Sequence, residues 1–355
     1  MKKLLLAIII LLLGYYLYAK TTQKKEQKCA NAPEFILDND HFDPDWVPTL
    51  VTALALDQNC EGKLIGVAIS GRDLNDRAGL MYQSVLRYYH RGDLKIGFNH
   101  EADTRELAAR ATAHNPKLVP EYLGTKKDIS EFDNDGIPDS KREDISKILC
   151  EVLQKSDGNV SYAIGGHPEN LEALLKETRY CNGRALVAKK IKQVIIGTGG
   201  YMLDHRPEHN LGLNMDIRKS TKYVVEHLPE NVKLIIGAEG YARENWWPKA
   251  GDQYKTDKHT DSPMAFIYAV PTYGVFGEHG VGDVEAVLYA VYGDTLDGFH
   301  MYDEIETCFR FDKDLVIYAV KGCTGKNHYY LREYKGFTAA LGKKVIPLIE
   351  QNVSK

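Results

Sequence analysis

Residues 34–45 have the sequence EFILDNDHFDPD, in which a short apolar run passes directly into four aspartates within eight residues. A continuous apolar run of this kind is typical of a strand that is buried on both faces of a parallel sheet. Ligands of open parallel sheets bind beyond the carboxyl ends of the strands. The stretch therefore predicts both the first strand of a sheet and one wall of a binding site.

Apolar runs of the same kind recur along the chain and alternate with helical patterns. We expect strands at 34–37, 63–69, 94–98, 160–164, 194–196, 234–236 and 315–318, with helices between them that include 49–56 and 81–89. This alternation predicts a Rossmann-like α/β fold, with a mostly parallel sheet and helices on both faces.

The aspartates after the first strand have two interpretations. Carboxylates this close repel one another and raise each other's pKa, and a hard cation such as Ca²⁺ is the usual partner of such a cluster. The alternative is a solvated acidic loop in which Asp43 or Asp45 caps the following helix. A second acidic segment, DNDGIPD at 133–139, has the oxygen spacing of calcium loops, but its composition also fits an ordinary turn.

The amino-terminal region predicts export. Two lysines precede an apolar run, which predicts a signal peptide or uncleaved signal anchor at 1–19, then a polar linker at 20–33 and one domain at 34–355. The positive-inside rule places that domain outside the cytoplasm, either membrane-anchored or periplasmic or extracellular. Six cysteines match no zinc spacing; either some of them pair, as an oxidising compartment allows, or they are small buried side chains.

The charge pattern excludes one class of partner. The net charge is −4, and no basic stripe with interleaved aromatic residues is present, so we do not expect nucleic acid to bind. The expected partners are a small molecule and, if the amino-terminal segment is uncleaved, the membrane. A homo-oligomer is left open.

Several short motifs follow one another in an order that is known from one family. They are DND at 38–40 with the helix at 49–56, AIGGHPENL at 163–171, IIGTGG at 195–200, EHN at 208–210 and GDVEAVLYAV at 282–291. Over about residues 34–300, this order resembles the inosine/uridine-preferring nucleoside hydrolases. Their Asp-x-Asp motif, Gly-x-x-Thr-Asn-Leu segment, Met-Gly-Gly strand end, Glu-x-Asn motif and late aspartate are the matching features.

The resemblance implies a Ca²⁺-dependent hydrolase of N-glycosidic bonds in nucleosides or related ribosides. Such hydrolysis passes through an oxocarbenium-like transition state at the sugar. Residue by residue, the implied metal ligands are Asp38, Asp40, Asp45, Asp283 and the backbone carbonyl of Glu169. Asp40 would also be the general base. Asn39, Glu208 and Asn210 would contact the substrate, with Asn214 as the competitor of Asn210.

The sequence also departs from the family pattern. The family's adjacent pair of aspartates is missing: Pro44 or Trp46 occupies one of its positions, and Asp45, with Asp43 as the backup, is the surviving acid. Gly282 stands where many members have His or Trp, so His279 is the expected general acid, with His167 and His209 as alternatives.

Two other functions compete with hydrolysis. The lost acid favours a catalytically inactive, membrane-tethered binding protein on the same fold. A haloacid-type phosphatase with Asp38 as its nucleophile is the weaker alternative, because the downstream Lys and Asp motifs of that family are not evident.

Overall fold

The computed structural model describes most of the expected domain. The described residues are 20, 26–41, 45–71, 76–100, 132–197, 209–212, 214–237, 263, 283–322, 326–334, 340, 342–345 and 347–348. The expected signal segment at 1–19 lies outside them. Within these ranges, no helix has the length and apolar character that crossing a bilayer requires.

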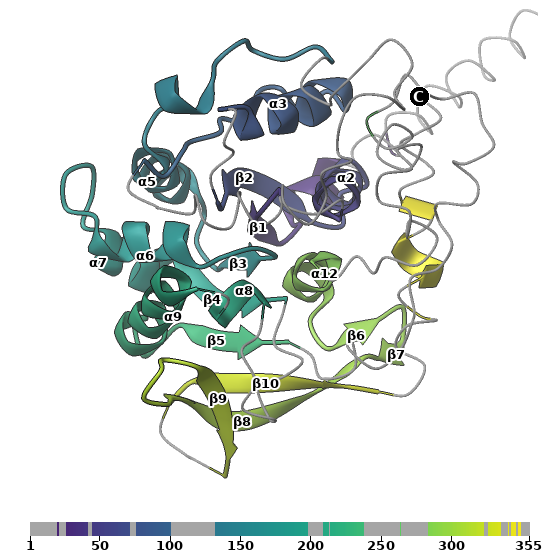
Figure 1. Ribbon diagram of the computed structural model, residues 1–355. Coiled ribbons are helices and arrows are strands. Elements are labelled where there is room, and N and C mark those ends of the chain that lie inside the picture. The colour runs from purple at the N-terminus through teal and green to yellow at the C-terminus, as the bar shows by residue number, and fades with distance from the viewer. Residues whose placement is uncertain are drawn as a thin grey trace, which may run out of the picture.

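An eight-stranded mixed sheet forms the centre of the molecule (Figure 1). Its strand order is β2-β1-β3-β4-β5-β10-β8-β9, and all neighbours from β2 to β10 run parallel, whereas β8 is antiparallel to β10 and to β9. The strands are β1 (Glu34–Asn39), β2 (Lys63–Ile69), β3 (Val160–Ile164), β4 (Ile191–Ile196), β5 (Lys233–Ile236), β8 (Tyr302–Phe311), β9 (Ile317–Lys321) and β10 (His328–Glu333), beside a small hairpin of β6 (Thr295–Leu296) and β7 (Phe299–His300). The predicted α/β fold with a mostly parallel sheet is confirmed.

Helices cover both faces of this sheet (Figure 1). The helices are α2 (Trp46–Gln58), α3 (Ala78–Tyr88), α5 (Ile145–Lys155), α6 (Glu169–Lys176), α7 (Gly183–Lys190), α8 (His209–Gly212), α9 (Met215–His227) and α12 (Val284–Tyr292), with a short 3₁₀ turn, η2 (Asp139–Lys141). Phe35 and Leu37 of β1 pack with α2, α3 and α12, whereas Ile36 packs with α5, α6, α7 and α9. Because alternate residues of a strand point to opposite faces, one short apolar run supplies both cores.

The structure differs from the expected elements in two places. Residues 94–98 form only the isolated bridges Val67–Ile96 and Phe98–Asp144 rather than a strand. Strand β10 and the long strand β8, which is antiparallel to it, were not predicted. After its buried first residue, β8 alternates half-buried and exposed positions along its first half, so it lacks the continuous apolar run that marks the parallel strands.

Edge strand β2 has its outward polar groups occupied by side chains. The backbone N–H of Leu64 donates to Asp57 Oδ1 at 3.0 Å, and Arg91 donates to the carbonyl oxygen of Leu64 at 3.3 Å. Arg91 and Asp57 also pair with each other. The two charged side chains therefore take the place of a further strand.

Disulfides join distant parts of the chain. Cys29 pairs with Cys60 and Cys150 with Cys181, and Cys308 is disulfide-bonded as well. No cysteine is free among the described residues. Disulfides persist in oxidising compartments, so the pairs indicate such an environment.

We predict that His328 makes the fold acid-sensitive. Its Nδ1 is buried without a hydrogen-bond partner in the described ranges, and its ring stacks on Phe309. Burial, with a smaller effect of the Lys326 charge, lowers the pKa of His328 from 6.5 to about 4. The unfolded chain therefore binds a proton first, and stability is lost as the pH falls from 6.5 through 4.

The size of this loss is roughly 2–3 kcal/mol, at about 1.4 kcal/mol per pKa unit. Urea denaturation at pH 7 and pH 4.5 measures it. In His328→Phe, the free energy of unfolding should fall less between pH 7 and pH 4.5 than in wild type, by on the order of 2 kcal/mol. An equal acid loss in wild type and variant would show that another group is responsible.

Candidate functional site

The carboxyl ends of β1 and β3 meet at the point where the strand order changes direction. From β1 the chain first adds β2 on one side and later β3 on the other, and such switch points hold the ligand sites of open parallel sheets. β1 ends in Asp38-Asn39 and passes into Asp40, whereas β3 passes into Gly165-Gly166.

The two glycines allow the acids to converge. A methyl group at Gly165 would lie 2.6 Å from Asp283 Cβ and closer still to Asn39 Oδ1, and one at Gly166 would lie 2.6 Å from the backbone N of Asp40. Asp283, the residue before α12, therefore lies beside the end of β1. Any larger residue at Gly165 or Gly166 would push Asp283 and the end of β1 apart.

Asp38 is completely enclosed. Its carboxylate accepts hydrogen bonds from the Tyr162 hydroxyl at 2.8 Å and from Asn170 Nδ2 at 2.9 Å. Burial raises the pKa of Asp38 from 3.8 to about 8, and the charge of Glu169 adds to this rise. A nearby cation would favour the charged form instead.

Asn39 is the clearest sign that the site takes a polar ligand. Its side chain is completely buried, and neither its amide nitrogen nor its amide oxygen has a hydrogen-bond partner in the described part of the chain. An unpaired buried amide costs about 1–3 kcal/mol, and native proteins rarely leave one without a reason. The amide oxygen of Asn39 and the side chain of Asp283 both lie against Gly165.

Several of the aspartates lie close to the hydroxyl of Tyr82 in α3. Tyr82 donates a hydrogen bond of 2.5 Å to the carbonyl oxygen of Asp40, and its ring stacks on Trp46 with 4.5 Å between the centroids. Burial raises the pKa of Tyr82 first, and four negative charges raise it further, those of Asp40, Asp283, Asp38 and Asp45. Sequence reasoning missed Tyr82, which looks like any aromatic residue on an amphipathic helix.

The remaining carboxylates of the prediction lie nearby. Asp45 is buried at the N-cap position of α2, but its side chain makes no capping hydrogen bond, so the alternative of a solvated capping loop does not describe it. Glu169 Oε1 accepts the N–H of Gly71 at 2.7 Å, and burial raises the pKa of Glu169 to about 7. Its carbonyl oxygen, the expected ligand, accepts Asn99 Nδ2 at 3.2 Å.

The two competing asparagines have different surroundings. Asn210 donates from Nδ2 to the carbonyl oxygen of Gly165 at 2.9 Å, which places it at the edge of the acid cluster. Asn214 caps α9 by accepting the N–H of Ile217. The site therefore favours Asn210. Three other expected residues lie outside the described ones: Glu208, His279 and Asp43.

The candidate histidine His167 is buried against an acid. Its Nδ1 lies 3.9 Å from Glu169 Oε1, and its backbone N–H donates to Ser70 Oγ. Nothing is described of the side chain of His209. His167 thus lies inside the wall of the site.

The second acidic segment is engaged by protein groups. Arg142 binds both oxygens of Asp135, at 2.9 and 3.0 Å, and Asp139 accepts the N–H groups of Ala78 and Gly79 at the start of α3. The segment thus fits the turn interpretation. Within the described ranges, no three His, Cys, Asp or Glu side chains form a ready-made metal site.

Comparison with known proteins identifies the fold. No family model matches the chain, and no curated protein matches it. Among solved structures, the purine-preferring ribonucleoside hydrolase of Gardnerella vaginalis aligns with a TM-score of 0.63 at 13% identity, over 90% of this chain and 100% of that one. The inosine-uridine preferring nucleoside hydrolase of Bacillus anthracis aligns with a TM-score of 0.59 at 13% identity, over 90% and 99%.

The chain has the nucleoside hydrolase fold. The same fold occurs in the type III effector protein XopQ, whose structure in complex with adenosine diphosphate ribose aligns with a TM-score of 0.58 at 14% identity, over 95% of this chain and 98% of that one. The resemblance inferred from the order of the motifs is thus confirmed at the level of the fold.

We predict that Gly165→Ala disrupts the convergence of the acids. The added methyl group would meet both Asn39 and Asp283, so it should destabilise the fold by about 1–3 kcal/mol, the usual cost of overpacking. Gly66→Ala is the matched control, because its methyl group would meet only Val152 side-chain atoms at 3.3 Å and Ile36 at 3.6 Å. Thermal unfolding compares the two; equal melting temperatures would argue against the tight approach at Gly165.

Proposed function

We propose that the protein is a Ca²⁺-dependent hydrolase of N-glycosidic bonds in nucleosides or related ribosides. One observation carries the proposal: Asn39 and Asp40 at the end of β1 converge with Asp283, the residue before α12, across a pair of glycines, at the switch point of a nucleoside hydrolase fold.

The residues present fit a calcium ion by their chemistry. All the donors are hard oxygen atoms, which Ca²⁺ prefers, and the buried oxygen of Asn39 lacks a partner in the described ranges. Asp38, Asp40, Asp45, Asp283 and the carbonyl of Glu169 would hold the ion. When bound, calcium would supply a Lewis acid that positions water and the vicinal ribose hydroxyls.

The chain's own side chains then have distinct tasks. Asp40 accepts a proton from the attacking water, and the surrounding carboxylates stabilise the positive charge that grows on the ribose. Asn39, Asn210 and Glu208 hydrogen-bond the ribose hydroxyls. His279 protonates the leaving base.

A second function is favoured by one specific observation. Pro44 or Trp46 occupies one position of the adjacent aspartate pair that the family uses, and the loss of an acid weakens the site. The fold also holds a riboside in XopQ, which was crystallised with adenosine diphosphate ribose. The alternative is therefore a riboside-binding protein without catalysis.

Export completes the proposal. The disulfides fit an oxidising compartment, and residues 1–19 would direct the domain there as a signal peptide or a retained anchor.

We predict that Asp40→Ala abolishes release of ribose from a nucleoside panel. The variant loses the general base, and such losses typically cost a factor of about 100 or more. Asp40→Ala should also lose the calcium-dependent rise in melting temperature that wild type shows. Asp297→Asn, at an exposed turn, is the matched control.

The outcomes of this experiment separate the two functions. Riboside binding without ribose release in wild type would establish the binding-protein alternative. Full hydrolysis by Asp40→Ala would show that the base is misassigned, and hydrolysis unaffected by a chelator would contradict the calcium requirement.

We predict a smaller effect for Tyr82→Phe. The variant keeps the ring that stacks on Trp46 and removes only the hydroxyl that holds the carbonyl of Asp40. Because the hydroxyl positions the base, kcat should fall about tenfold while KM changes less than about threefold, the loss of one hydrogen bond being about 1–1.5 kcal/mol. An unchanged kcat would show that the hydroxyl does not position Asp40.

A further inference from the structure

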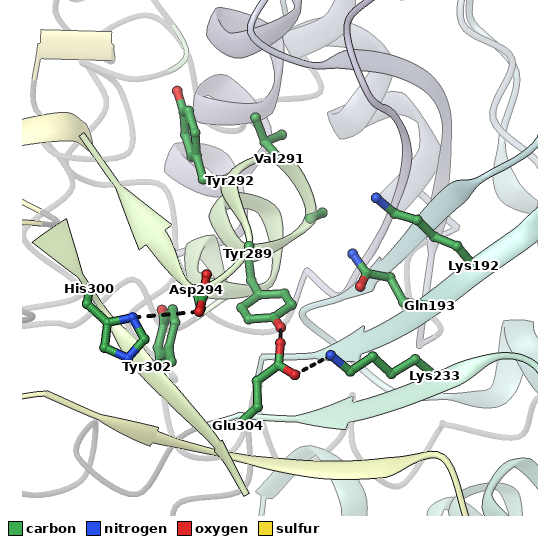
Figure 2. A pocket seen from close by; sticks show the side chains of 12 residues that line it. Lys192, Gln193, Lys233, Tyr289, Val291, Tyr292, Asp294, His300, Tyr302 and Glu304 are labelled. Carbon is green, nitrogen blue, oxygen red and sulfur yellow. Dashed lines mark hydrogen bonds and ion pairs between the residues drawn. The ribbon is translucent and has the colours of Figure 1, made fainter. Parts of the chain in front are cut away.

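A polar pocket of about 490 Å³ lies at the amino-terminal ends of β4 and β5 (Figure 2). The candidate site lies beyond the carboxyl ends of β1 and β3. The pocket and the candidate site are therefore at opposite ends of the parallel strands. α12 runs between them, with Asp283 before its first residue and Tyr289–Asp294 in the pocket wall. The volume falls within the range of small-molecule sites, about 300–1,000 Å³.

Several charged side chains of this pocket are paired with one another. Glu304 accepts the hydroxyl of Tyr289 and forms an ion pair with Lys233. On the other side, His300 Nδ1 lies 3.6 Å from the carboxylate of Asp294 (Figure 2). These contacts fix the walls and leave little charge uncompensated there.

Lys192 is the exception. The Lys192 side chain is exposed at the start of β4, and no carboxylate in the described ranges pairs with its ammonium group; partial desolvation, followed by the positive charge of Lys233, lowers the pKa of Lys192. Figure 2 shows Lys192 and Gln193 extending from β4 toward Tyr289. Gln193 Nε2 donates to Ser161 Oγ at 3.0 Å. This hydrogen bond uses the amide nitrogen of Gln193 and not its amide oxygen. One wall thus presents a cation that an anion would stabilise.

The facing wall has the opposite character. It contains the carboxyl end of α12, which carries the negative end of the helix dipole, and Asp294, whose side chain is 50% exposed. Groups of this kind accept hydrogen bonds from hydroxyls. The pocket therefore suits a ligand with a negative charge at one end and hydroxyl donors at the other.

We propose that this pocket binds a small polyhydroxy anion. Its carboxylate or phosphate meets Lys192, and its hydroxyl groups donate to Asp294 and to the amide oxygen of Gln193. Sugar acids and sugar phosphates share this chemistry. The proposal does not depend on hydrolysis at the other end of the parallel strands.

Calorimetric titration of the full chain tests this site, with gluconate as the carboxylate probe and ribose 5-phosphate as the phosphate probe. At least one anion should saturate a single site. Lys192→Gln should weaken its binding tenfold or more. Lys189→Gln, the same change at an exposed lysine of α7 outside the pocket, should change it less than twofold.

Two comparisons separate this pocket from the candidate active site. Asp40→Ala should bind the anion as wild type does, and in that variant uncharged ribose should bind at least tenfold more weakly than the anion. Saturation by gluconate alone would identify a sugar acid, and saturation by the phosphate alone a sugar phosphate. The proposal is overturned if neither anion saturates, if Lys192→Gln binds like wild type, or if Asp40→Ala loses the anion.

Discussion

Burial of negative charge at the end of β1 is the constraint on which the rest of the site depends. Asp38 is enclosed on all sides, and the two side chains that donate to it, from Tyr162 and Asn170, are neutral. Neutral donors satisfy the oxygens but do not compensate a full charge in a low-dielectric interior. The nearby start of α12 offers the positive end of a helix dipole, which reduces the cost only in part.

The parallel half of the sheet could be predicted because its strands are buried on both faces. β1 and β3 are buried at every position, and each carries mostly apolar side chains, such as the run Phe35-Ile36-Leu37 of β1, that do not alternate with charged ones. β8 and β10 escaped prediction, because β8 mixes exposed and buried positions. The segment at 94–98 was overpredicted for the opposite reason: it is apolar, but it contributes only isolated bridges.

Some residues of the candidate site could likewise be predicted from the sequence, and others could not. Asp38 and Asp40 could be placed at a strand end because they directly follow the apolar run. Asp283 lies far along the chain and was connected to them only through the resemblance. Tyr82 and Asn170 could not be recognised, because their importance arises from contacts with Asp40 and Asp38 that exist only in the folded chain.

The side chains at the edge of β2 bear on the solubility of the protein. A bare strand edge offers unpaired N–H and C=O groups that can recruit a strand from another molecule. Asp57 and Arg91 occupy both backbone groups of Leu64, and a strand that approached there would have to displace an ion pair. The sheet is therefore closed to growth at this point, which guards against edge-to-edge aggregation.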